Sequence, residues 1–309
     1  MKSSKKINIR GPVYPICPSF NKNEDLDINE TINYIKYLEK RGAKNFIITA
    51  GTSRVNLLDD QELKTLNEIL CKNTNSMSIK IVSNHVYGDL KKNLEFIEHA
   101  KKIKANAIII YISERYYGDN AIYEFFKIID RYCGKLKFFI HCANLRNEVK
   151  GKGDFVSISK NLFNKLLRLK NFSGIKEEFG DPRLRYEIIS SYSNKIDIIT
   201  AGPSMQGYIS NHLFGLNAYL SSVGSFDPKI EENFYNELIN NRNFERSIQY
   251  IKKYEDYWES ELDEGWHISM KAALNIMGLM KIYERKPMKP VDKKSYNAIK
   301  RNLKKIKLI

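Results

Sequence analysis

The sequence lacks the features of several protein classes. No apolar run approaches the length of a bilayer span, and the basic first residues lead into Ile-Asn-Ile-Arg-Gly-Pro rather than the apolar core of a signal peptide. The four cysteines have neither metal-ligand spacing nor a disulfide framework; they are Cys17, Cys71, Cys133 and Cys142. We therefore expect a protein of a reduced, cytoplasmic compartment that has no membrane contact and no metal site.

Acidic residues are also too few to balance the basic ones. The chain has 51 Lys and Arg residues against 36 Asp and Glu residues, a net charge of +15. A nucleic-acid-binding protein should gather such charge on one face or groove. Here the lysines are spread over nearly every helical segment, with the densest runs at 293–294 and 300–307. We expect a solvated surface without nucleic-acid binding, whose field attracts anionic substrates such as keto acids.

Eight short apolar runs alternate with amphipathic segments along most of the chain. They cover residues 13–17, 45–49, 79–83, 107–112, 136–141, 172–176, 196–200 and 218–222. Continuous apolar runs are typical of parallel strands that are covered on both faces. No Gly-x-Gly-x-x-Gly follows the first run, which argues against an open dinucleotide-binding sheet. The pattern predicts an α/β protein with a (β/α)8 TIM barrel over residues 1–243.

The strand pattern stops after about residue 243. The remaining chain has helical spacing over roughly 244–261, 265–280 and 293–306, and Pro287 and Pro290 separate the last two segments. We therefore predict a C-terminal helical extension over residues 244–309.

Lys176 is the most informative residue, because it follows an apolar run and a glycine at the predicted end of the sixth strand. A lysine is rarely driven into a packed core, since its charge is costly to desolvate. Burial favours the neutral amine, which is a nucleophile that can form a Schiff base with a ketone. The alternative is a lysine that extends from the strand end to water.

The other predicted strand ends carry hydroxyls, phenols, an imidazole and a guanidinium. In a barrel these ends meet at one mouth. Such groups suit the binding of an anionic carbonyl compound. The candidate residues besides Lys176 are Thr52, Ser53, Tyr116, Tyr117, His141, Arg146 and Gly202.

Four motifs follow one another in a specific order. They are Pro18-Ser19-Phe20, Gly51-Thr52-Ser53, Gly174-Ile175-Lys176-Glu177 with Gly180-Asp181, and Met270-Lys271-Ala272-Ala273-Leu274. From about Gly11 to the C-terminus, the chain resembles the dihydrodipicolinate synthase and N-acetylneuraminate lyase family of class I pyruvate-dependent aldolases. The third motif matches that family's Schiff-base motif, Gly-Ile-Lys-Glu-x-x-Gly-Asp.

The resemblance implies a role for each candidate residue. Lys176 would form the Schiff base, and the hydroxyl and N–H groups of Thr52 and Ser53 would hold the substrate carboxylate, with Thr52 also in the catalytic group. Gly202 would leave room for the bound keto acid. The resemblance further implies that Arg146 binds a second carboxylate, that Tyr116 or Tyr117 supplies an aromatic group, that no cofactor is needed, and that the protein is a homo-oligomer, either a tetramer or a dimer.

The chain departs from the family pattern at three places near this mouth. One of them follows the fourth strand, where the family often has Pro-Tyr-Tyr and the match of this chain is loose. His141 stands where the family usually has a tyrosine that shuttles protons, and an imidazole can do the same near neutral pH. Arg54-Val55 replaces the family's Gly-Glu and is expected to add a cation near the mouth. The carboxylates of Glu177, Glu178 and Asp181 are interpreted as helix caps.

The resemblance implies a Schiff-base lyase or synthase. It would act on pyruvate or another 2-keto acid, with an aldehyde as the second substrate, in a dihydrodipicolinate synthase-like reaction. Two alternatives remain open. The protein could be an N-acetylneuraminate lyase-like sugar-acid aldolase. It could also be a catalytically drifted family member that acts as a small-metabolite-binding or regulatory protein.

Overall fold

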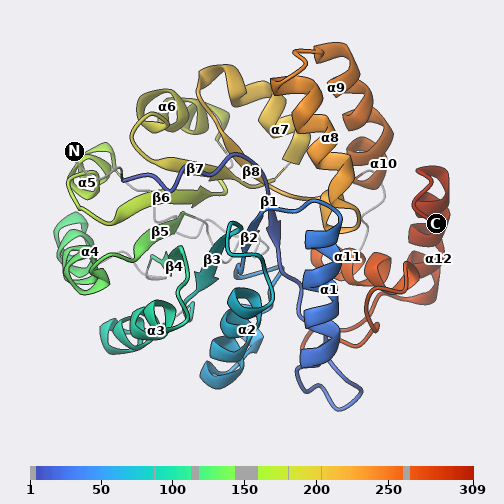
Figure 1. Ribbon diagram of the computed structural model, residues 1–309, viewed down its shortest axis with the longest axis horizontal. Coiled ribbons are helices and arrows are strands. Elements are labelled where there is room, and N and C mark those ends of the chain that lie inside the picture. Colours follow the sequence, from blue (N-terminus) through green and yellow to red (C-terminus); the bar gives the residue numbers. More distant parts are fainter. Residues whose placement is uncertain are drawn as a thin grey trace.

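Eight parallel strands form a closed barrel at the centre of the molecule (Figure 1). Each strand pairs with the next along the chain, and β1 closes the ring on β8, with Gly11 opposite Ala218. This is the predicted (β/α)8 TIM barrel. The strands are β1 (Gly11–Pro15), β2 (Asn45–Ile47), β3 (Ile79–Ser83), β4 (Ala107–Tyr111), β5 (Lys137–Cys142), β6 (Phe172–Glu177), β7 (Asp197–Thr200) and β8 (Ala218–Leu220).

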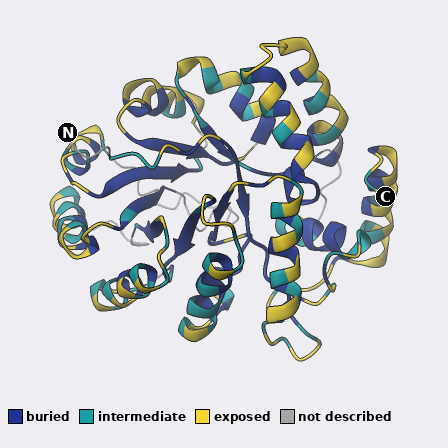
Figure 2. Ribbon diagram, in the orientation of Figure 1, coloured by how far each residue is buried: buried dark blue, intermediate teal, exposed yellow. Residues whose placement is uncertain are grey.

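The structure is a computed structural model that describes residues 5–86, 88–112, 118–142, 159–179, 181–202, 204–259 and 265–309. Helices surround the barrel, and Figure 2 shows that the strands are buried while the outer faces of the helices are exposed. A helix follows each strand: α1 (Ile28–Lys40), α2 (Asp60–Lys72), α3 (Leu90–Lys102), α4 (Asp119–Cys133), α5 (Lys160–Leu166), α6 (Pro182–Tyr192), α7 (Ser204–Asn211) and α8 (Pro228–Ile239).

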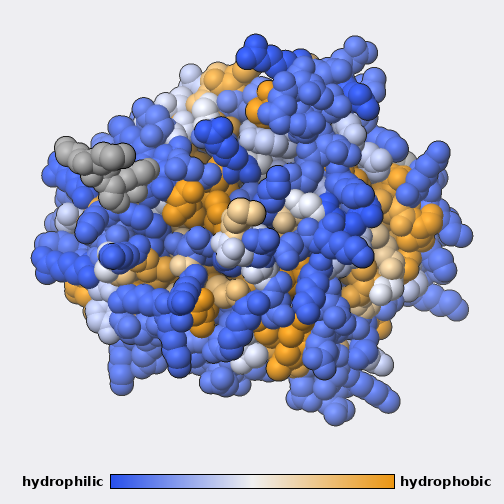
Figure 3. All heavy atoms as spheres, in the orientation of Figure 1, coloured by the Kyte–Doolittle hydropathy of each residue, from blue (hydrophilic) through white to orange (hydrophobic). Residues whose placement is uncertain are grey.

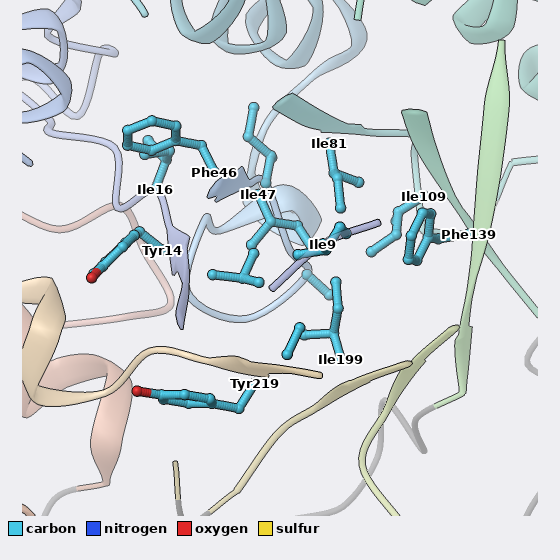
Figure 4. Close-up of a cluster of buried hydrophobic side chains, with 14 of the residues drawn as sticks. Ile9, Tyr14, Ile16, Phe46, Ile47, Ile81, Ile109, Phe139, Ile199 and Tyr219 are labelled. Carbon is cyan, nitrogen blue, oxygen red and sulfur yellow. The ribbon is translucent and has the colours of Figure 1, made fainter. Parts of the chain in front are cut away.

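The barrel interior is packed with side chains from alternate strand positions. In Figure 4, Ile47, Ile81, Ile109, Phe139 and Ile199 point toward one another inside the ring of strands. These residues are fully buried. Because successive side chains of a strand point to opposite faces, the residues two positions further along these strands also point inward. This alternation brings polar side chains together at the carboxyl ends of the strands.

The N-terminal segment closes the opposite end of the barrel. The carboxylate of Asp197, at the start of β7, accepts hydrogen bonds from the N–H groups of Ile7 at 2.8 Å and Asn8 at 3.1 Å. Ile9 then enters the core and is 1% exposed. The amino ends of the strands are thereby covered, and the carboxyl ends remain for function, as in other barrels of this kind.

The C-terminal part is helical, as predicted. It contains α9 (Phe244–Tyr250), a π-helical turn η4 (Ile251–Glu255), α10 (Asp256–Glu259), α11 (Trp266–Ile276) and α12 (Lys293–Lys305). After α11 the chain runs beside the start of α1, where Lys281 donates a hydrogen bond to Asp27 at 2.9 Å. The domain boundary at residue 243 stays a prediction.

The described helices include none that is both long and apolar enough to span a bilayer. The face shown in Figure 3 is mostly hydrophilic, with smaller apolar areas between the charged side chains.

Candidate active site

Lys176 lies at the carboxyl end of β6 and points into the barrel. Gly174, two residues earlier, faces Phe139, because a Cβ atom on Gly174 would lie 2.3 Å from the Phe139 ring. Since Phe139 is an interior residue, Gly174 and therefore Lys176 face the interior as well. The Lys176 side chain is 1% exposed. The expected burial of this amine is thus present, and the alternative of a lysine extending to water is wrong for this structure.

His141 contacts the Lys176 amine directly. The two residues are register partners on β5 and β6, so their side chains point to the same side of the barrel. The distance from Lys176 Nζ to His141 Nε2 is 3.0 Å. On its other side, the His141 ring packs edge-on against Tyr111 of β4, with 5.2 Å between ring centres. The structure therefore brings together the two residues that sequence reasoning ranked first.

The row of polar side chains continues through Tyr111 to β3. The Tyr111 hydroxyl lies 2.9 Å from Oγ of Ser83. Ser83, Tyr111, His141 and Lys176 thus come from four consecutive strands, and the last three are register partners. Burial raises the pKa of the Tyr111 phenol, so this group is a neutral hydrogen-bond partner at neutral pH.

Glu178 completes a cluster that the sequence analysis did not predict. Its Oε1 atom forms an ion pair with Lys176 Nζ and lies 3.1 Å from His141 Nε2. The expectation that Glu178 caps a helix is wrong, and so is the same expectation for Glu177, which pairs with Arg185 at 2.9 Å. Asp181 is the N-cap of α6, as expected, and accepts from the N–H of Arg183.

Charge and burial fix the protonation states in this cluster. Burial lowers the pKa of the His141 imidazole, and the adjacent Lys176 charge lowers it further, so the ring is neutral at neutral pH. Burial alone would raise the pKa of Glu178. The Lys176 charge outweighs that effect and holds the pKa of Glu178 well below its usual range. At neutral pH the site holds a carboxylate, a neutral imidazole and a lysine.

The loop after β2 brings Thr52 and Ser53 into the interior, at 2% and 0% exposure. Ser53 is used by the loop itself: its N–H donates to the Thr49 carbonyl at 3.1 Å, and its hydroxyl accepts from the Thr49 N–H at 3.0 Å. A hydroxyl that accepts one bond still has its own proton to donate. The Ser53 N–H is therefore already used within the loop, and the roles of Thr52 and Ser53 in holding a carboxylate stay predictions.

Arg54 does not add a cation to the mouth, contrary to the expectation. Its guanidinium is fully buried and pairs with Glu284, with 2.5 Å between Nη2 and Oε1. It also donates to the Thr52 carbonyl at 2.6 Å and to the His267 carbonyl at 3.0 Å. Arg54 thus fixes the loop from behind rather than facing a ligand.

Gly202, just after β7, has open space on its side-chain face. A Cβ atom there would meet no atom within 4 Å, and its φ of +108° disfavours any other residue. The role of Gly202 in leaving room for a ligand stays a prediction. The remaining candidates, Tyr116, Tyr117 and Arg146, lie outside the described residues, and their roles stay predictions.

His267 is a second residue that sequence reasoning missed. It lies near the start of α11, and its ring packs against Gly51: a Cβ atom on Gly51 would lie 2.4 Å from Nε2. Burial and the Arg54 charge lower the pKa of His267 to about 4, so this imidazole is neutral as well. A helical segment far along the chain gives no local signal that it reaches the loop after β2.

Among the described residues, no group of three or more His, Cys, Asp or Glu side chains is arranged to hold a metal ion. The cluster of an amine, an imidazole and a carboxylate can instead move protons around a nucleophile.

Comparisons with known proteins identify the family to which the chain belongs. The model of the dihydrodipicolinate synthetase family matches residues 8–306. The chain belongs to this family, and so to the class I aldolase superfamily. Family membership supports a lyase that acts as a pyruvate-dependent aldolase or synthase. A search of curated protein sequences finds no match.

Two solved structures illustrate the likeness within the family. N-acetylneuraminate lyase from Fusobacterium nucleatum is 17% identical, with a TM-score of 0.83 over 96% of this chain and 98% of that one. Dihydrodipicolinate synthase from Acinetobacter baumannii, solved with pyruvate, is 18% identical, with a TM-score of 0.84 over 98% of this chain and 100% of that one. At such identities the likeness shows the fold, and the site must be argued from this chain's own residues.

Proposed function

We propose that this protein forms a Schiff base between Lys176 and pyruvate or another 2-keto acid, and then makes or breaks a carbon–carbon bond with an aldehyde as the second partner. The observation that carries the proposal is the Lys176 amine, 1% exposed at the carboxyl end of β6 and 3.0 Å from a neutral imidazole. Family membership and a relative solved with pyruvate support the same substrate class.

The first step would be attack of the neutral Lys176 amine on the ketone carbon. The nitrogen lone pair forms the N–C bond, and the C=O electrons move to oxygen, which takes a proton from the attacking nitrogen. Loss of that oxygen as water leaves an iminium. His141, whose Nε2 lies 3.0 Å from the nitrogen, can accept the proton that the ammonium must lose before attack and return it to the departing oxygen.

The iminium then acts as an electron sink. A proton or a carbon–carbon bond at the neighbouring carbon can be lost, and its electrons form an enamine. Attack of the enamine on an aldehyde gives condensation, and the reverse gives cleavage. Thr52 would hold the substrate carboxylate, and the open space at Gly202 would admit the keto acid.

Borohydride trapping with pyruvate, followed by peptide mass spectrometry, tests the proposal. Wild-type protein should carry a reduced adduct on the peptide with Lys176, and Lys176→Ala should carry none. Lys271 is an internal control, because it is also 1% exposed but donates to the Pro18 carbonyl at 2.8 Å, and it should stay unlabelled. His141→Phe should still form the adduct, with turnover reduced by about 10²- to 10⁴-fold.

The second candidate function is a barrel that binds a small metabolite without catalysis. The observation that favours it is the ion pair of Lys176 with Glu178, because this contact engages the amine that would have to attack a ketone. Wild-type protein that binds pyruvate in calorimetry but yields no trapped adduct would support this candidate and count against the lyase.

A further inference from the structure

Strand alternation places Glu178 at the reacting amine. Its N–H donates to the Cys142 carbonyl at 3.1 Å, which extends the ladder between β5 and β6 by one residue. Glu178 and Lys176 are two positions apart on this extended strand, so their side chains point to the same side. The carboxylate therefore lies inside the mouth of the barrel and not on the outer face of α6.

One oxygen of Glu178 contacts both nitrogens of the cluster. Oε1 forms the ion pair with Lys176 Nζ and lies 3.1 Å from His141 Nε2, while these two nitrogens are 3.0 Å apart. Among the described residues, the side-chain partners of Glu178 are Lys176 and His141. Its side chain is 30% exposed, so a ligand can reach the cluster from the mouth. Because this carboxylate caps no helix, the contacts suggest a role in the chemistry.

We propose that Glu178 is a further catalytic residue, the shared counter-ion for a positive charge that moves between Lys176 and His141. This inference rests on the proposed Schiff-base function. In this role the Glu178 carboxylate contacts both nitrogens that carry the charge during the reaction, Lys176 Nζ and His141 Nε2.

The charge balance of the reaction requires such a partner at each stage. An ammonium and a ketone become an iminium and water, so the site has one positive charge before and after. Between these states, the first proton that leaves Lys176 Nζ sits on His141 Nε2. After the nitrogen has attacked the ketone carbon, a second proton moves from this nitrogen to the former ketone oxygen, which gives a neutral carbinolamine. The proton on His141 then passes to the hydroxyl. The hydroxyl leaves as water and takes the C–O bonding pair, and the nitrogen lone pair forms the C=N bond of the iminium. Glu178 Oε1 touches the charged atom in each state.

Removing only the charge of Glu178 tests this role. Glu178→Gln keeps the size of the side chain, and the rate of borohydride trapping with pyruvate would be measured from pH 5 to 10. The ammonium loses its counter-ion, so the pH midpoint of the trapping rate should fall by about one unit or more. The maximal rate at the high-pH plateau should fall at least about tenfold, because the imidazolium and the iminium also lose their partner.

The other groups that face Glu178 are unchanged in this variant. Tyr111 of β4 and His267 of α11 both interact electrostatically with Glu178, and Arg54 acts on His267. A purely structural role of Glu178 would lower stability without moving the pH midpoint, so thermal unfolding is measured in parallel. Glu187→Gln, on the exposed part of α6, is the matched surface control and should trap pyruvate at the wild-type rate.

The outcomes separate this inference from the proposed function. No adduct in the wild type would remove the Schiff-base function itself. An adduct in the wild type together with an unchanged plateau and midpoint in Glu178→Gln would overturn only the counter-ion role. A higher plateau rate of trapping in Glu178→Gln would also overturn it, because the carboxylate of the wild-type protein would then restrain the amine. If Glu178→Gln does not fold, Glu178→Asp decides: a slower plateau with the wild-type midpoint supports the role, and a wild-type plateau contradicts it.

Discussion

The interior of the barrel leaves no space for a side chain at Gly174. A Cβ atom there would lie 2.3 Å from the Phe139 ring and 2.4 Å from the carbonyl oxygen of Asp197. The ring could rotate or shift, but the carbonyl belongs to the backbone of β7, which the strand ladder holds in place. Gly174 therefore lets β6 and β7 approach closely just below the amine of Lys176, and it sets the position of the reactive group.

Gly174→Ala should destabilise the protein by at least about 2 kcal/mol, since overpacking a core against fixed atoms forces a backbone shift. Denaturant unfolding measures the loss. Gly207→Ala is the matched control, because Gly207 lies in α7 and a Cβ atom there meets nothing within 4 Å. This control should be neutral or more stable by about 0.5 to 1 kcal/mol. Equal stability of the two variants would contradict the packing argument.

Residue types that are unusual in their setting could be identified from the sequence. A lysine and a histidine at the ends of apolar strands are such residues, and the structure brings Lys176 and His141 into contact. Glu178 was missed because a glutamate just before a helix usually serves as a cap. Extending the strand alternation by two residues beyond Lys176 would have placed the Glu178 side chain inside the barrel. No comparable signal existed for His267, which reaches the site through tertiary packing.

At the level of elements, α8 holds the loop after β8 through one buried carboxylate. Glu231 is fully buried, and its Oε1 atom accepts hydrogen bonds from the N–H groups of Ser222 and Gly224, both at 2.8 Å. Burial raises the pKa of Glu231 to about 7, despite these donors. The helix thus fixes one edge of the barrel mouth with a group whose charge depends on pH near neutrality.

The raised pKa of Glu231 predicts a specific pH dependence. Its pKa in the unfolded chain is near the ordinary value of 4.5, so the folded protein holds the proton more tightly and wild-type stability falls as pH rises from about 4.5 to 7. Glu231→Gln keeps the acceptor oxygen but cannot ionise. The free energy of unfolding of this variant, relative to that of wild type, should rise by up to about 3 kcal/mol between pH 4.5 and 7, and the difference should stay constant at higher pH.

Unfolding of both proteins at several pH values measures this difference. The similarly raised pKa of Glu177 is common to both and cancels. A stability difference that is the same at pH 5 and pH 8 would show that Glu231 does not titrate in the folded protein.

The existence and order of the strands could be predicted because each is a continuous apolar run. Their ends were less certain. The first run was predicted to end at Cys17, whereas β1 ends at Pro15. The difference is small, since the N–H of Ile16 still donates to the Ile47 carbonyl at 3.0 Å and continues the ladder. Turn and loop conformations decide such ends, and apolar periodicity does not report them.

At the scale of the whole molecule, the C-terminal extension is tied to the barrel by buried and partly buried polar contacts. Lys271 of α11 donates to the Pro18 carbonyl at 2.8 Å, and Arg285 pairs with Glu62 of α2. The Arg54–Glu284 pair has both side chains at 0% exposure. The sequence predicted helices after residue 243 but not these contacts, because they join residues more than 200 positions apart. We expect the extension and the barrel to unfold together.

The Arg54–Glu284 pair tests this coupling. Removing one partner of a buried ion pair leaves an uncompensated charge, so Arg54→Met should cost about 3 to 5 kcal/mol in a single cooperative transition. Arg54→Met combined with Glu284→Met removes both charges and should recover most of that loss. The exposed pair of Lys72 and Glu68 is the control, and Lys72→Met there should cost less than about 1 kcal/mol.

Denaturant unfolding, monitored by near-UV circular dichroism, reports the transitions. Two separate transitions in Arg54→Met would mean that the extension folds on its own. If the double variant is no more stable than Arg54→Met, the loss comes from packing and not from the unpaired charge of Glu284.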